Sequence, residues 1–110
     1  MRPIEKEILE FSILKELSYN DNIPTSKDYN IDEKFYVSLF KGMVNKLYLN
    51  PNRVLFNILG YVQIENELDL VTNRGNEFIQ AHEGWNKMYN SLNDYKKLWD
   101  KEVRNDWFFT

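Results

Sequence analysis

Four polar residues recur through residues 33–47 at the spacing of one helix face: Lys34, Ser38, Lys41 and Asn45. Steps of four, three and four positions place them in a single stripe. Such a stripe suits the major groove of DNA, where lysine meets phosphate or guanine and asparagine pairs with adenine. The alternative is the solvated face of an amphipathic helix, which has the same pattern.

The surroundings of the stripe argue in both directions. Lys27 before it and Arg53 after it are further candidates for phosphate contacts, although an exposed residue in a turn is the commoner role for each. The stripe lacks arginine, the commonest base-reading residue. Asp32 and Glu33 stand at the end of the helix that usually enters the groove, where they would repel phosphate. Arg74 is given little weight as a DNA contact.

Residue types for catalysis or metal binding do not gather into a known motif. His82 is the only histidine, and Glu77 and Glu83 near it have no recognised ligand spacing. The chain has no cysteine, no Gly-rich phosphate loop and no Ser/His/Asp set. We therefore expect no enzyme activity, no metal site and no cofactor.

Composition bounds the class of protein. With 110 residues, 43% hydrophobic and 28% charged, the chain has the size and make-up of one globular domain. Its net charge is −3, and residues 51–83 carry five acids against two bases, so no part is a strongly basic nucleic-acid domain. The first residues lack the apolar run of a signal peptide, and no stretch is long enough for a membrane helix. These features predict a cytoplasmic protein without membrane contact.

Hydrophobic periodicity predicts the elements that position the stripe. Residues 4–18 predict a first helix covered on more than one side, and residues 25–30 one short helical turn. Asp32 is expected to cap the helix over residues 33–47. Its apolar face is formed by Tyr36, Leu39, Phe40, Met43 and Leu47.

The second half of the chain predicts a hairpin and two helices. Residues 61–64 and 68–71 alternate as strands do, with residues 65–67 as the turn between them. The apolar run within residues 50–59 fits either a strand or a helical turn capped by Asn50. Thr72 is expected to cap a helix to about His82, and Gly84 to separate it from a final helix.

This order predicts an α+β fold that is mostly α. Three helices followed by a β-hairpin is the order of a winged helix-turn-helix, with the hairpin as the wing and one or two additional C-terminal helices. The helix before the hairpin would be the recognition helix. We expect residues 1–83 to form the winged-helix domain, and residues 84–110 to form a C-terminal helix and an aromatic tail.

Residues 72–79 resemble the Leu/Val-Thr-x-x-Gly-x-x-aromatic-Leu signature that follows the wing in many winged-helix proteins. Trp85, Lys87 and Tyr89 match the Trp-x-Lys-x-Tyr pattern of the YjcQ family, from Gram-positive bacteria and their phages. Residues 13–17 also look like that family's first helix. The family usually has Glu-Asn-Ser before the tryptophan, where this chain has residues 82–84, so the start of the last helix stays open. The resemblance implies a winged-helix fold and a DNA-binding or regulatory role in a phage, prophage or mobile element.

The last helix and tail carry an apolar seam with a period of three and four. It either forms a homodimer or partner interface or folds back onto the chain's own core, and the sequence leaves both open. The interface candidates are Trp85, Met88, Leu92, Tyr95, Trp99, Trp107 and Phe108.

Two functions follow from these observations. The first is DNA binding and transcription regulation, in which double-stranded DNA is the partner and the protein acts as a dimer. The second is an acidic protein-binding module, a phage-encoded inhibitor or modulator of a host protein that uses the same fold without DNA. Its support is the acidity of residues 51–83 and the aromatic tail.

Overall fold

A computed structural model describes residues 3–19, 23–57, 62–64 and 70–91. In this part of the chain, helices α1 (Pro3–Tyr19), α2 (Glu33–Asn45), α3 (Asn73–Ala81) and α4 (Glu83–Ser91) accompany one hairpin of strands β1 (Val54–Phe56) and β2 (Val62–Ile64). A 3-10 turn, Pro51–Arg53, precedes β1. The described part of the fold is therefore mostly helical with a small antiparallel hairpin, which agrees with the predicted α+β class that is mostly α.

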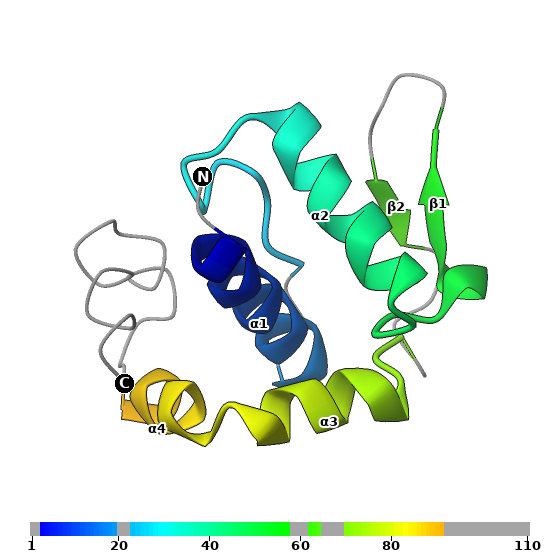
Figure 1. Cartoon of the computed structure of the whole chain (residues 1–110). Helices are drawn as coiled ribbons and strands as arrows, with labels where there is room; N and C mark the ends of the chain where they lie inside the picture. Colours follow the sequence, from blue (N-terminus) through cyan, green and yellow to red (C-terminus); the bar gives the residue numbers. More distant parts are fainter. Residues whose placement is uncertain (1–2, 20–22, 58–61, 65–69, 92–110) are drawn as a thin grey trace.

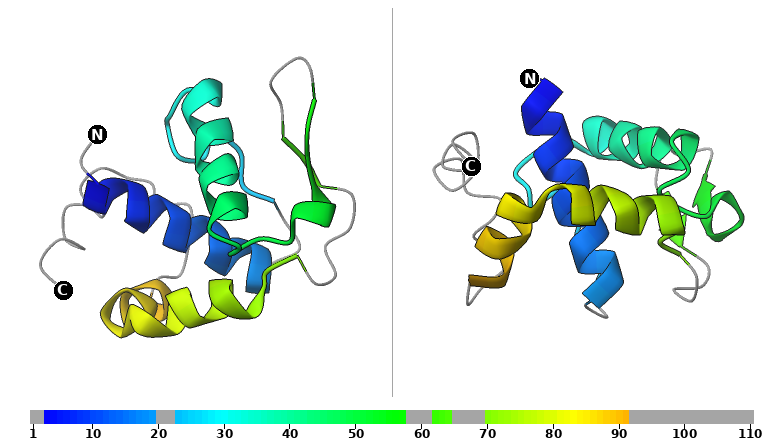
Figure 2. Two further views of the ribbon diagram at one scale, coloured as in Figure 1. Left: turned by 45° about the vertical axis from the view of Figure 1, so that its right-hand side comes forward. Right: turned by 60° about the horizontal axis from the view of Figure 1, so that its bottom comes forward.

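The central element is α1, and α2 and α3 both pack against it (Figure 1). Its apolar residues are not confined to one stripe, and several on different sides of the helix are fully buried, among them Leu9, Phe11 and Ile13. This confirms the prediction of a helix covered on more than one side. In Figures 1 and 2, α2 lies between α1 and the hairpin, while α3 crosses α1 and α4 continues beyond the crossing.

Helix α2 begins where the sequence predicts. The Asp32 side chain accepts a hydrogen bond from the Phe35 backbone N–H at 2.7 Å, which satisfies one of the free donors of the first turn. The predicted apolar face is buried at Tyr36, Leu39, Phe40 and Met43.

The predicted extension of α2 to Leu47 is wrong. The helix ends at Asn45, and Leu47 adopts φ 62° with 48% of its surface exposed. The Tyr48 N–H donates to the Met43 carbonyl and the Leu47 N–H to the Val44 carbonyl, at 2.9 and 3.0 Å. These two bonds form a Schellman C-cap, which needs a left-handed residue where Leu47 stands.

The predicted strand pairing is also wrong. Residues 62–64 pair with β1, in the register Val54↔Ile64 to Phe56↔Val62, and among the described residues no pairing joins them to residues 70 and 71. Val71 instead bridges Leu49, next to the bond from the Asn50 N–H to the Leu70 carbonyl. The sequence left a strand or a helical turn open for residues 50–59, and residues 50–56 contain both. Asn50 caps the 3-10 turn, and strand β1 follows it directly. The expected turn at 65–67 lies outside the described residues.

The joint between α3 and α4 lies at His82, one residue before the helix that contains Gly84. His82 leaves the helical conformation, with φ −109° and ψ 60°, and its Nδ1 lies 2.8 Å from the Phe78 carbonyl oxygen. The prediction that Gly84 separates the two helices is therefore corrected: α3 ends at Ala81, His82 forms the break, and Gly84 lies inside α4. Thr72 caps α3 as expected, accepting from the Gly75 N–H at 3.1 Å.

Candidate nucleic-acid interface

The outward face of α2 carries the polar stripe. All four of its residues are exposed, while the opposite face of the helix is buried against the core. The structure thus brings together Lys34, Ser38, Lys41 and Asn45 on one surface. Exposure alone suits both a groove-reading helix and a solvated one.

Two of the stripe residues have contacts that limit how they can act. The Ser38 hydroxyl donates to the Phe35 carbonyl at 2.6 Å, so it has lone pairs but no spare proton for a ligand. The Lys41 ammonium lies 5.6 Å from the centre of the Phe56 ring. This cation–π distance joins α2 to β1, so Lys41 stands at the junction between the helix and the hairpin.

Lys27 and Arg53 flank the two ends of α2. Lys27 is exposed in the turn before the helix, whose Asp28 carboxylate accepts from the Thr25 N–H at 2.9 Å. Arg53 is half-buried in the 3-10 turn after the helix, and its Nε is buried without a hydrogen-bond partner. Because α2 is about 20 Å long, the two cations would meet phosphates well apart on a duplex.

The turn that carries Lys27 is tied to α2 by Tyr36. The Tyr36 hydroxyl donates to the Pro24 carbonyl, and its ring lies edge-on to Phe40 at 5.0 Å. Burial raises the pKa of the Tyr36 hydroxyl far above its ordinary value, and the Glu33 and Asp28 carboxylates raise it further. The hydroxyl is therefore a permanent donor at physiological pH.

Both acids at the start of α2 have local partners. Asp32 caps the helix, and the Glu33 carboxylate accepts from the Ser26 hydroxyl at 2.6 Å. These bonds explain why acids stand there, since carboxylates near a helix N-terminus are stabilised by its free N–H groups. Both carboxylates therefore stand at the same end of α2 as Lys34.

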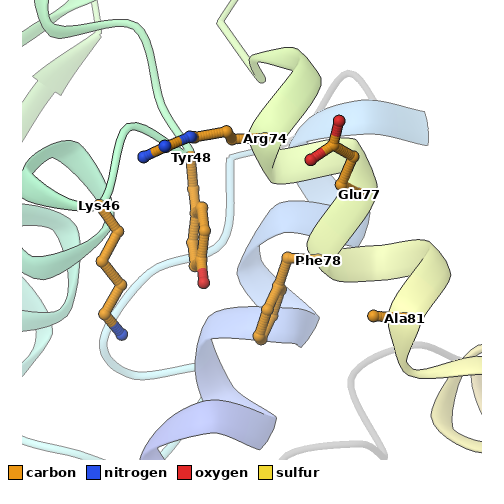
Figure 3. A pocket seen from close by; sticks show the side chains of 6 residues that line it. All are labelled: Lys46, Tyr48, Arg74, Glu77, Phe78 and Ala81. Carbon is orange, nitrogen blue, oxygen red and sulfur yellow. The ribbon is translucent and has the colours of Figure 1, made fainter.

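Sequence reasoning missed a pocket at the other end of α2. Its volume is about 530 Å³, and Figure 3 shows the side chains that surround it. The lining comes from the chain just after α2 and from α3: Lys46, Tyr48, Arg74, Glu77, Phe78 and Ala81. The sequence could not predict this pocket, because residues that meet across two distant segments leave no local spacing signal. Of the lining residues, only Arg74 is considered above as a DNA contact.

The interface candidates are described only at the start of α4. The Trp85 side chain is buried, 5.7 Å from Phe11 of α1 and stacked on His82 at 4.2 Å between ring centres. Trp85 therefore completes this chain's own core, and its side chain offers little surface to a second chain. Of the other candidates, nothing is described for the Met88 side chain, and Leu92, Tyr95, Trp99, Trp107 and Phe108 lie outside the described residues. The division at residue 84 stays a prediction.

Comparison with protein-family models, with curated proteins and with solved structures gives no match. The resemblance to the YjcQ family therefore stays a prediction. Within residues 3–91, as far as they are described, no helix is long and apolar enough to cross a membrane. The same part of the chain holds no cluster of three acidic or histidine side chains that would suit a metal ion.

Proposed function

We propose that this chain is a cytoplasmic DNA-binding protein of winged helix-turn-helix architecture, in which α2 is the recognition helix and the β1–β2 hairpin is the wing. The observation that carries the proposal is the exposed polar stripe on α2 together with the hairpin that follows this helix. The helix is followed by a hairpin that Lys41 contacts through Phe56. The winged-helix order places a reading helix directly before such a hairpin.

Four cations would supply the phosphate contacts, two from the stripe and one from each flank: Lys34, Lys41, Lys27 and Arg53. Four contacts correspond to a slope of about −3.6 in a plot of log affinity against log salt concentration. The net charge of −3 opposes approach to DNA, so non-specific affinity is expected only at low salt. Asn45 would read base edges, and the YjcQ resemblance supports a regulatory role in a phage or mobile element.

The test is fluorescence anisotropy with a random-sequence duplex, from about 20 to about 200 mM salt. The double variant Lys34→Ala/Lys41→Ala is expected to lose two phosphate contacts and so lower the salt slope by about 1.8. The matched control is Lys87→Ala, because Lys87 is exposed on α4, away from the stripe. Circular dichroism of each variant checks that the helices remain folded.

Absence of binding at the lowest salt, or equal loss in the Lys87→Ala control, would overturn DNA binding through α2. The second candidate, the acidic protein-binding module, would then take its place. One observation favours it: Leu55 on β1 is 43% exposed, an apolar side chain on the outer surface of the hairpin. Capture of a partner that Leu55→Lys abolishes would support that function.

A further inference from the structure

The two lysines of the polar stripe differ in how their ammonium groups are held. The Lys41 ammonium lies 5.6 Å from the centre of the Phe56 ring on β1, which is within the distance of about 6 Å at which a ring face attracts a cation. In the part of the chain that the structure describes, Lys34 has no such ring contact. One lysine of the stripe therefore has a fixed neighbour in the hairpin, and the other does not.

The Phe56 ring is itself held by the core. Along β1, Val54 is buried, Leu55 is exposed and Phe56 is half-buried, so Val54 and Phe56 share the inner face of the strand. Phe56 packs against the hydrophobic core and lies opposite Val62 in the register with β2. Figures 1 and 2 both show the hairpin beside α2. The ring is therefore a firm support for the flexible side chain of Lys41.

The ring contact changes what Lys41 loses when it binds a ligand. A long lysine side chain gives up rotamer freedom when its ammonium is fixed by a ligand, and this loss weakens binding. A ring that restricts the side chain beforehand reduces the loss. Lys41 is exposed, and within the described residues it makes no ion pair, so its N–H groups that face away from the ring can donate to an anion.

We propose that Phe56 is a positioning residue for DNA binding. Its ring holds the Lys41 ammonium at the junction of α2 and β1, where the ammonium pairs with a backbone phosphate and keeps its contact with the ring. This inference rests on the proposed function and deepens it, because it assigns one phosphate to the junction of helix and hairpin. Lys34 lacks a ring, so Lys41→Met is expected to weaken DNA binding more than Lys34→Met.

The ring contact is tested first without DNA, by NMR of the lysine Hε protons. Protons over a ring face are shifted upfield, so the Hε signal of Lys41 should lie upfield of that of Lys34. Phe56→Leu keeps an apolar side chain without a ring and should move the Lys41 signal to the position of Lys34. Phe56→Tyr keeps the ring and should keep the shift. A Lys41 signal that does not change in Phe56→Leu would overturn the ring contact, whether or not the protein binds DNA.

The pairing with phosphate is tested by a double-mutant cycle in the anisotropy titration at about 20 mM salt. Phe56→Leu should weaken binding about two- to fivefold, as expected for an exposed cation–π contact, and Phe56→Tyr should retain most of the affinity. In a Lys41→Met background, Phe56→Leu should have no further effect. Phe35→Leu is the matched control, because Phe35 is a half-buried ring of α2 that packs against the same core. It should bind DNA as the unaltered protein does.

The outcomes separate this proposal from the proposed function. Equal weakening by Phe56→Leu with and without Lys41 would show that Phe56 acts through the fold of the hairpin, and would overturn its positioning role. Tighter binding of Phe56→Leu would also overturn it, because the ring would then compete with the phosphate for the lysine. Both results leave DNA binding itself intact. Absence of DNA binding by the unaltered protein would overturn the proposed function and the pairing with phosphate together.

Discussion

The backbone carbonyl of Tyr48 lies against Gly75, and a Cβ at Gly75 would be 2.5 Å from its oxygen and 2.8 Å from a methyl group of Val71. Neither neighbour can yield easily, because Tyr48 accepts the Thr72 N–H and Val71 bridges Leu49. The first turn of α3 is therefore held against the base of the hairpin by a contact that only glycine permits.

Gly75→Ala is expected to lower the free energy of unfolding by about 1–3 kcal/mol, because the added methyl group overpacks a rigid site. Gly42→Ala is the matched control. Nothing lies within 4 Å of a Cβ at Gly42, so the change should stabilise α2 by about 0.5–1 kcal/mol through helix propensity. Urea unfolding of both variants measures the difference, and a Gly75→Ala protein as stable as Gly42→Ala would contradict the close approach.

Leu47 offers the opposite test, because it occupies a conformation that favours glycine. Its φ is 62°, and nearly half of its surface is exposed, so little burial is lost on shortening it. Leu47→Gly should stabilise the protein by about 1 kcal/mol through relief of the left-handed backbone. Leu47→Ala, which keeps the Cβ, should not. The check is the urea midpoint of each variant, and equal midpoints would show that the C-cap is not strained.

The ion pair between Glu10 and Lys46 is asymmetric, since the Glu10 side chain is 1% exposed and that of Lys46 is 46% exposed. Lys46→Met leaves the Glu10 carboxylate buried without its cation and should lower the free energy of unfolding by about 2–3 kcal/mol. This loss is smaller than for a pair in which both partners are buried. Glu10→Gln leaves Lys46 able to reach water and should cost about 1 kcal/mol. Chemical denaturation ranks the two variants. A larger loss in Glu10→Gln would refute the argument from burial.

Tyr36 gives the stability a dependence on pH in the alkaline range. The folded pKa is raised well above the ordinary value of 10.0, so at higher pH only the unfolded chain releases the proton and stability falls. Tyr36 then contributes a loss of about 1.4 kcal/mol between pH 9 and pH 11. Tyr36→Phe removes this contribution. The unfolding free energies of the two proteins, compared at both values of pH, should converge by that amount as pH rises.

The start points of the helices could be predicted from the sequence because their signals are local. Asp32 and Thr72 each cap a helix by accepting a hydrogen bond from the backbone N–H three residues further along. The apolar face of α2 follows from the spacing of its hydrophobic residues. The exposure of the polar stripe follows from the same periodicity. A side chain that bonds its own helix leaves its signature in a short window of sequence.

The contacts between distant segments could not be predicted in this way. Residues 62–64 alternate equally well whether they pair with β1 or with a later strand, so periodicity could not choose the partner. The end of α2 depended on the left-handed residue Leu47, which carries no glycine or asparagine signal. The pocket joins Tyr48 to Phe78, thirty positions apart, through direct stacking of their rings.

At the start of α4, Trp85 packs on this chain's own core and not in a dimer or partner interface. It is 7% exposed and packs between Phe11 and His82, so Trp85→Ala should lower the unfolding free energy by about 3–5 kcal/mol through loss of core packing. The loss should be the same at about 2 and about 40 μM protein, because a contact within one chain does not depend on concentration. Lys87→Ala on the same helix controls for helix propensity. A loss that grows with protein concentration would instead place Trp85 in a dimer interface.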